Sequence, residues 1–167
     1  MYIETERLII TDFTEDMAEA VHLNSLDEDN RRFVPDEVFE TLEEAQETVN
    51  ALIACYSGEE GPFVYPVLRR ADGANMGYVQ LAPLDGGWEI GYHIAAPYTR
   101  QGYASEAVRA FLPVMMERLG IAEVIGVCLS DNVSSRRVMA KCGFRPVFEG
   151  MGPYQGMERP ICRFIYP

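Results

Sequence analysis

Segment 97–107 constrains the fold most strongly, because it joins a predicted strand at 89–94 to a predicted helix through a loop that contains a glycine. The first N–H groups of a helix have no partner within the helix and lie where its dipole is positive, an arrangement that suits a diphosphate group. Gly102 lets a ligand approach the backbone closely, and Ala104 keeps the first turn small. The segment therefore predicts an anion-binding loop, with an ordinary strand-to-helix turn as the alternative.

Two common nucleotide-binding loops are excluded by their sequence patterns. No Lys-Ser or Lys-Thr pair follows Gly102, as a P-loop requires, and the chain contains no G-x-G-x-x-G. A second segment nevertheless favours a ligand site, because 124–129 is typical of a strand and 131–144 is typical of a helix that ends at a glycine. A strand, a loop and a helix thus occur twice in succession.

With both segments, the sequence resembles the GNAT superfamily of acyl-CoA-dependent N-acyltransferases over most of its length. In that family an R/Q-x-x-G-x-G/A loop binds the pyrophosphate of coenzyme A. Gly102 and Ala104 match the small residues of this loop, whereas Thr99 stands at its Arg/Gln position. The loop match is therefore incomplete.

The later N-x-x-S and K-x-G-F signature of the family matches Asn132, Ser135 and segment 141–144. Together with Glu-Thr-Glu-Arg-Leu at 4–8, this pattern is similar to the branch that acetylates N-terminal alanines of ribosomal proteins. The same branch includes many enzymes of other amine substrates. The resemblance implies an N-acetyltransferase that moves an acetyl group from acetyl-CoA to a primary amine.

The resemblance also implies where acetyl-CoA binds. Backbone groups at the end of strand 88–94 would hydrogen-bond the pantetheine arm as another strand would, and the loop would hold the diphosphate. Asn132 would contact the arm from the other side, or cap its own helix, or do both. The expected cofactor-binding residues are Ile94, Ala96, Arg100, Gln101, Gly102, Tyr103, Ala104, Ser105 and Asn132.

Direct attack of an amine on a thioester needs a neutral amine, a polarised carbonyl and a proton for the leaving thiolate. Glu89 is the predicted base, because the family commonly uses a carboxylate on this strand; an exposed strand carboxylate without a role is the alternative. His93 lies on the same face of the strand by alternation and is the other candidate base.

The proton donor is less clearly marked. Many family members carry a tyrosine acid four residues before the glycine of G-F, where this chain has Met139. The N-x-x-S branch suggests Ser135 in that role, with a serine on the helix surface as the alternative. No cysteine has a neighbouring His in a recognisable arrangement, so direct transfer in a ternary complex is favoured over a covalent acyl-enzyme.

A chain of 167 residues with 48% hydrophobic content is large enough for one domain, predicted to span 1–167. The expected elements are, in order, a strand, two helices, three antiparallel strands, a helix, a strand, a helix and two strands. This order predicts an α/β (α+β) fold with a mixed, mostly antiparallel sheet flanked by about four helices. The fourth and fifth strands, 88–94 and 124–129, are joined through a helix and are therefore predicted to be parallel. The resemblance implies that these two strands splay apart.

Three further predictions concern segments near the expected site. The polar segment 27–32 and the Gly- and Pro-rich segment 150–160 are both expected to be loops. Thr41 and Glu44 form a capping box that starts a helix. The resemblance implies that this helical region and its loop form one wall of the acceptor pocket, so that residues 33–39 help to choose the substrate, with ordinary packing under a loop as the alternative.

Composition limits the partners. The formal net charge of −12 argues against nucleic acid, because phosphate backbones are bound through clustered Lys and Arg. Acidity instead suits a cationic amine acceptor, or keeps a cytosolic domain soluble. The cysteines form no C-x-x-C pair and are typical of reduced thiols, and no metal site is predicted. No apolar run is long enough to span a membrane, so a cytoplasmic location is expected.

Two other classes of function remain. An acyl-CoA-binding module without turnover is the main alternative, because Thr99 and Met139 both depart from the family pattern. A scaffold that binds a peptide strand in the cleft is the third. The sequence leaves open the acceptor, which is either a protein N-terminus or a small amine, and the oligomeric state, including a homodimer.

Overall fold

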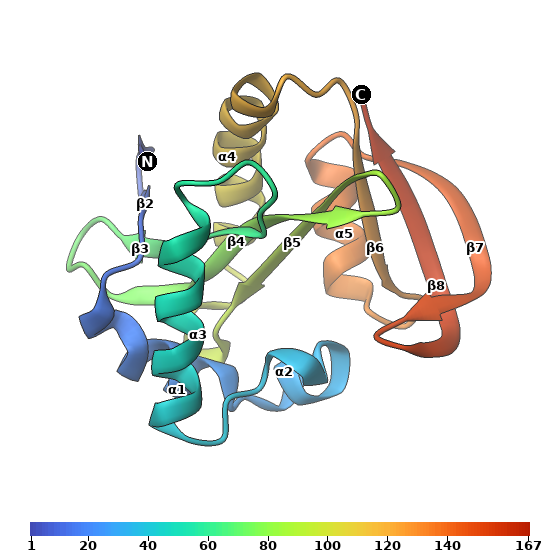
Figure 1. Ribbon diagram of the computed structural model, residues 1–167. Coiled ribbons are helices and arrows are strands. Elements are labelled where there is room, and N and C mark those ends of the chain that lie inside the picture. The colour runs from blue at the N-terminus through green and yellow to red at the C-terminus, as the bar shows by residue number, and fades with distance from the viewer.

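The computed structural model describes residues 1–167 as an eight-stranded sheet with helices on both faces (Figure 1). The strand order is β1-β2-β3-β4-β5-β6-β8-β7, and every neighbouring pair is antiparallel except β5 with β6. The strands are β1 (Tyr2–Glu4), β2 (Leu8–Thr11), β3 (Phe63–Arg69), β4 (Asn75–Leu84), β5 (Gly87–Ile94), β6 (Val124–Leu129), β7 (Arg145–Tyr154) and β8 (Met157–Tyr166). The predicted α/β fold with a mixed, mostly antiparallel sheet is confirmed.

Helix α4 covers one face of the sheet, and α1 and α3 cover the other (Figure 1). The α-helices are α1 (Ala18–Ser25), α2 (Glu28–Phe33), α3 (Leu42–Cys55), α4 (Tyr103–Leu119) and α5 (Val133–Lys141). The short 3-10 helix η2 (Pro35–Glu37) follows α2. The capping box predicted at Thr41 and Glu44 is present at the start of α3.

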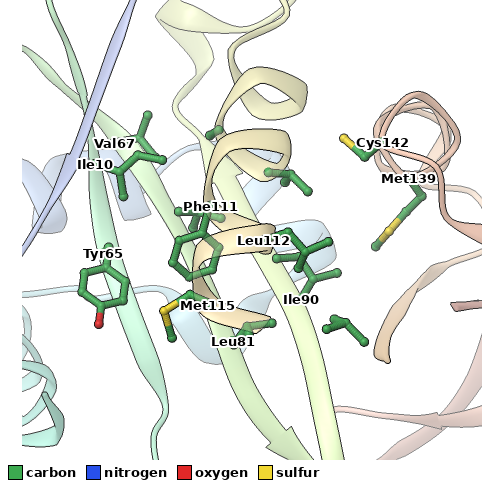
Figure 2. Packing of buried hydrophobic residues seen from close by; sticks show 14 of the residues in the cluster. Ile10, Tyr65, Val67, Leu81, Ile90, Phe111, Leu112, Met115, Met139 and Cys142 are labelled. Atoms are coloured by element: carbon green, nitrogen blue, oxygen red, sulfur yellow. The ribbon is translucent and has the colours of Figure 1, made fainter. Parts of the chain in front are cut away.

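Alternation along β3 explains why both faces are covered. Tyr65 and Val67 belong to the main core beneath α4, whereas Val64 packs in a smaller core with Val49 of α3. Figure 2 shows Phe111 and its neighbours on α4 directed at the side chains of the sheet. Burial of these apolar side chains holds the sheet between its helices, and Ile90 and Ile94 anchor β5 in the same main core.

The parallel pair β5 and β6 is joined over a short stretch only. Glu89 pairs with Ile125 and Ile90 pairs with Gly126, whereas the two strands continue to Ile94 and Leu129. On its other side, β5 pairs with β4 from Gly87 to Ile94. The last residues of β5 therefore have backbone groups without a strand partner on the β6 side. Because β1 precedes the first predicted strand, β5 and β6 are the fourth and fifth strands of the prediction, and their parallel pairing is confirmed.

The prediction of a loop at 27–32 is wrong, because α2 occupies this segment. Asp27 caps the helix by accepting a hydrogen bond from the Asn30 N–H at 2.8 Å. The buried Asn30 side chain in turn donates to the carbonyls of Ser25 and Glu37, at 2.9 and 3.0 Å. Since α2 is short and has no apolar periodicity, its cap is the one sequence feature that distinguishes it from a loop.

The prediction of a loop at 150–160 is also wrong, because β7 and β8 form a hairpin through it. Gln155 and Gly156, with φ of 48° and 76°, make the tight turn, which is typical of a hairpin connection. Pro153 and Pro160 do not disrupt the pairing. Pro153 lies in β7, at the edge of the sheet. Pro160 precedes the pairing of β8 with β6, which begins at Ile161, and its carbonyl accepts from the Ser130 N–H at 2.9 Å, so neither proline has to supply an N–H to a central ladder.

The core assignment can be tested at Phe111, which is fully buried and whose ring centroid lies 5.7 Å from that of Tyr65. We expect Phe111→Ala to lower the free energy of unfolding by about 3–5 kcal/mol in urea denaturation, because it leaves a cavity between α4 and the sheet. Arg109→Ala, at an exposed position of the same helix, is the control and should change stability by less than about 0.5 kcal/mol. Equal losses from the two substitutions would contradict this account of the core.

Candidate active site

The loop that follows β5 borders a cavity of about 560 Å³ together with the start of α4 and one side of α5. Seven of the expected cofactor-binding residues line it: Ile94, Arg100, Gly102, Tyr103, Ala104, Ser105 and Asn132. The other two lie beside it, where the Ala96 N–H donates to Asp27 at 3.2 Å and the Gln101 carbonyl accepts from Arg7 at 2.8 Å.

The loop backbone has the conformation that close approach to a ligand requires. Arg100 and Gly102 have φ of 63° and 80°, in the left-handed region. Glu106 makes the first hydrogen bond of α4, to the Gly102 carbonyl, so the N–H groups of residues 103–105 have no helical partner. These donors at a helix N-terminus fit a phosphate group.

The N-terminal segment holds this loop in place. Arg7 donates to the Gln101 carbonyl at 2.8 Å and to Glu106 at 2.7 Å, and the Thr5 hydroxyl donates to Glu106 at 2.6 Å. The Arg7 guanidinium also lies 4.4 Å from the centroid of the Tyr103 ring. The Glu-Thr-Glu-Arg-Leu segment, which carried part of the resemblance, therefore has a physical role in positioning the first turn of α4.

Positive charge gathers at this cavity although the chain as a whole has a net charge of −12. Arg137 and Lys141 of α5 line it opposite the Arg100 loop. Sequence reasoning gave neither α5 residue a role, although Lys141 begins the K-x-G-F signature, and their spacing of one helical turn was the available signal. Cationic side chains and free backbone N–H groups together match the charge of a coenzyme A diphosphate.

A second cavity, of about 900 Å³, opens on the face of β5, β6 and β8 and is closed by η2 and the β7–β8 hairpin. Val34, Tyr92, Asn132 and Ser135 line both cavities, so the two meet where β5 and β6 part. Val34 belongs to segment 33–39, which was expected to form part of the acceptor wall. A ligand in one cavity can therefore meet a ligand in the other.

Glu89 of β5 lines the second cavity, three residues before Tyr92 of the shared lining. Burial raises the pKa of Glu89 to about 7; the Arg163 guanidinium lowers it and the Glu37 carboxylate raises it further. The carboxyl is therefore not the exposed strand residue that was the alternative interpretation. Near neutral pH it exchanges a proton readily, as a general base must.

Glu37 of η2 is a second largely buried carboxyl in the same cavity, and sequence reasoning did not single it out. Burial raises its pKa to about 7, against the opposing influence of His93. Its Oε2 atom has no hydrogen-bond partner. The expected acceptor wall at 33–39 was the only signal that pointed near it.

His93, the other candidate base, contacts a carboxylate instead of standing free. Its Nε2 atom lies 3.1 Å from Asp27 Oδ2, at the start of α2. Burial acts to raise the pKa of Asp27, but His93 and the N–H groups of Asn30 and Ala96 together hold it below its usual value. His93 borders the cavity of about 560 Å³ beside the loop, called the cofactor cavity below, and does not border the second cavity.

Ser135 lies in the first turn of α5, where its N–H donates to the Asn132 side chain at 3.1 Å. Asn132 is therefore the N-cap of α5 as well as a residue of both cavities. The Ser135 and Tyr92 hydroxyls are 2.8 Å apart, and the Tyr92 hydroxyl donates to the Ser135 carbonyl at 3.2 Å. Burial raises the pKa of Tyr92, so its hydroxyl stays protonated at neutral pH. Sequence reasoning missed Tyr92, because a tyrosine in a strand is usually a packing residue.

Met139 occupies the family's tyrosine position and is buried against β6. A Cβ on Gly126 would lie 2.5 Å from the Met139 Cε, so this glycine makes room for the methionine.

The four cysteines are unpaired, and no three His, Cys, Asp or Glu side chains come together as metal ligands. None of the helices has the length and apolar character needed to cross a membrane.

Comparison with known proteins agrees with this geometry. The sequence pattern of the acetyltransferase (GNAT) domain matches residues 7–145. YnaD, an uncharacterised N-acetyltransferase of Bacillus subtilis (strain 168), is 31% identical over 147 residues, which cover 87% of this chain and 83% of that protein. A GNAT-family acetyltransferase from Bacillus anthracis has a similar crystal structure, with a TM-score of 0.83 and 28% identity over 99% of this chain and 98% of that one.

RimL, a ribosomal L7/L12 alpha-N-protein acetyltransferase solved in complex with coenzyme A, shares the fold with a TM-score of 0.80. The two chains are 19% identical, and the match covers 99% of this chain and 97% of that one. Members of the GNAT family use acetyl-CoA to acetylate amines, and the loop and cavities described above fit that cosubstrate. The chain therefore belongs to the GNAT family and is an acetyl-CoA-dependent acetyltransferase.

Proposed function

We propose that residues 1–167 act as a single domain that acetylates a primary amine by direct attack in a ternary complex. The observation that carries this proposal is the junction of the two cavities, whose shared lining includes Tyr92, Asn132 and Ser135. Acetyl-CoA supplies an activated acetyl thioester. Its phosphates fit the cofactor cavity, which Arg137 and Lys141 line. Its thioester end fits the place where the two cavities meet, beside the unpaired end of β5.

Glu89 is the proposed base. Glu89 lies in the second cavity, which we call the acceptor cavity, and the pKa of its carboxyl is about 7. A large share of the carboxyl is therefore ionised at neutral pH and can take a proton from an ammonium. His93 is the weaker candidate because its ring already contacts Asp27. A water molecule between Glu89 and the amine would extend the reach of this carboxylate.

Ser135 is the proposed source of the proton for the leaving thiolate, with Tyr92 as its hydrogen-bond partner. The two hydroxyls at the junction are 2.8 Å apart and either can donate to the other, so the pair forms a donor chain from the tyrosine when the Tyr92 proton turns from the Ser135 carbonyl to the Ser135 hydroxyl. Tyr92 holds the orientation of the serine hydroxyl and can replace the proton that Ser135 donates. This pair occupies the role that the family's tyrosine fills elsewhere, and Met139 leaves that role vacant.

Direct transfer is favoured over a covalent acyl-enzyme. Cys128 is the one cysteine that lines either cavity, and burial raises its pKa to about 11. A thiol with so high a pKa is almost fully protonated at neutral pH and is a poor nucleophile. An acyl-CoA-binding module without turnover is the alternative function, and release of coenzyme A in the presence of amines distinguishes the two.

The first prediction tests the cofactor loop. Gly102→Val should weaken acetyl-CoA binding at least about tenfold in calorimetry, because a β-branched residue is strained at φ 80° and intrudes on the loop. Gly120→Val is a matched control at the other end of α4, with φ of 63° and open space around its Cβ position. The control should lose stability without losing affinity. Unchanged affinity in Gly102→Val would refute this cofactor site.

The second prediction tests the base. In the wild type, kcat/KM should rise as pH increases through about 7, because the Glu89 carboxylate becomes more abundant above its pKa. Glu89→Gln cannot titrate, so this inflection should disappear and kcat/KM should fall on the order of 10²-fold, least at high pH where free amine is plentiful. Glu123→Gln, at an exposed site, is the control. Overlapping pH profiles for Glu89→Gln and wild type would transfer the role to His93.

The third prediction tests the proton donor. Ser135→Ala should lower kcat by roughly 10- to 10³-fold with little change in acetyl-CoA affinity, since the hydroxyl matters only as sulfur gains charge. Tyr92→Phe should give a smaller loss, and Ser57→Ala, at an exposed serine, none. Normal turnover in Ser135→Ala would make this serine a structural residue of α5. Weaker cofactor binding at unchanged kcat would instead make it a cofactor contact.

A further inference from the structure

Two buried atoms of opposite charge lack hydrogen-bond partners in the acceptor cavity. They are Oε2 of Glu37 and Nε of Arg163. Buried polar atoms are nearly always paired, so each of these two atoms lacks the partner that its burial calls for, while the Arg163 side chain as a whole is 38% exposed. The two side chains make no ion pair with each other, so neither satisfies the other. A ligand that carries both a cation and an anion would satisfy both.

Arg163 is placed to meet an anion next to the reacting nitrogen. It lies on β8, opposite Val127 of β6 and Phe148 of β7, on the side of the sheet that faces the cavity. Its one ion-pair partner, Asp85, is 3.8 Å away with a side chain that is 77% exposed, and such an ion pair is weak. The guanidinium is near enough to Glu89 to influence that carboxyl, so a group bound to it lies close to the proposed base.

The cavity is bounded on the side away from the sheet. The Tyr154 hydroxyl donates to the Phe33 carbonyl, and the Asp36 N–H donates to the Gln155 side chain at 3.3 Å. These two bonds join the turn of the β7–β8 hairpin to the segment that carries Glu37. The bridge favours a small molecule over a polypeptide strand, and the volume of about 900 Å³ is in the range of small-molecule sites.

The remaining walls are apolar. Val127, Phe148, Met151 and Ile161 surround the charged groups and come from β6, β7 and β8. These side chains suit an uncharged, apolar body on the acceptor. The charged atoms hold the reacting nitrogen and the anionic group of the ligand, and the apolar walls contact the rest of the ligand.

We propose that the acceptor is a free α-amino acid, or a close analogue, with an apolar side chain: Arg163 binds its carboxylate, and Glu37 positions its ammonium beside Glu89. The planar guanidinium fork matches a carboxylate in two parallel hydrogen bonds, which an amine without an anionic group cannot make. This proposal rests on the proposed acetyltransferase function and adds the class of acceptor to it.

The reaction balances with the groups in place. The ammonium gives one proton to Glu89, the nitrogen forms a bond to the acetyl carbon, and the carbon–sulfur bond of acetyl-CoA breaks. A second proton of the nitrogen leaves to solvent, and the thiolate takes one from Ser135, which Tyr92 or water replaces. Water reprotonates the hydroxyl pair, which offsets the proton that the nitrogen gave to solvent, and Glu89 releases its proton to water. The net products are the N-acetylated amino acid, coenzyme A as its thiol, and one proton.

The test compares L-phenylalanine, L-leucine and L-methionine with their decarboxylated amines, by coenzyme A release and by mass spectrometry of the products. The wild type should prefer at least one amino acid over its amine by about tenfold or more in kcat/KM, because the amine leaves Arg163 unpaired. Arg163→Gln should abolish this preference by lowering kcat/KM for the amino acid at least about tenfold more than for the amine, whose reaction it affects only through the pKa of Glu89. Arg163→Lys, which keeps the charge without the fork, should retain part of it.

The controls separate this proposal from the one on which it rests. Arg159→Gln, an exposed arginine on the same strand, should keep the full preference. Amines that react as well as their amino acids, or a peptide with N-terminal phenylalanine that reacts better than free phenylalanine, would overturn the proposed acceptor and leave the acetyltransferase function standing. Binding of acetyl-CoA without acetylation of any amine, amino acid or peptide would overturn both.

Discussion

The short parallel contact between β5 and β6 is the constraint on which the site depends. Each strand is held firmly by an antiparallel partner, β4 on one side and β8 on the other, while only Glu89 and Ile90 of β5 pair with β6. The two strands are therefore fixed in position but not closed against each other. The opening between them lets two cavities from different parts of the molecule meet.

Charge is separated along this opening in a chain that is acidic overall. Arg137 and Lys141 face the cofactor cavity, whereas Glu37 and Glu89 face the acceptor cavity. In the cofactor cavity the cations lie beside free backbone donors, which stabilises bound phosphates. In the acceptor cavity, burial raises the pKa of both carboxyls to about 7, so their protonation can follow that of an amine.

The sequence was sufficient where local patterns determine structure. The periodicity of α4, the glycine at 102 and the helix connecting β5 to β6 allowed the fold, the loop and the parallel pair to be predicted. It failed for the β7–β8 hairpin, because Gly and Pro indicate a loop unless the edge position of β7 is known. It also missed Glu37 and Arg163, whose significance depends on a cavity formed by segments far apart in the chain. Tyr92 was missed because the feature that singles it out is its contact with the Ser135 hydroxyl, and no local sequence pattern connects these two residues.

The β7–β8 hairpin has a consequence for how such enzymes diversify. The family pattern ends at residue 145, and nearly the whole hairpin lies after it, yet the hairpin supplies Arg163, Tyr154 and much of the apolar wall. The cofactor cavity, in contrast, is complete with residues up to Lys141. The cofactor cavity therefore uses no residue of the final stretch, whereas the acceptor cavity combines that stretch with Glu37 and Glu89 from earlier in the chain. Under the proposed acceptor assignment, a change confined to the final stretch alters acceptor binding and leaves every residue of the acetyl donor site in place.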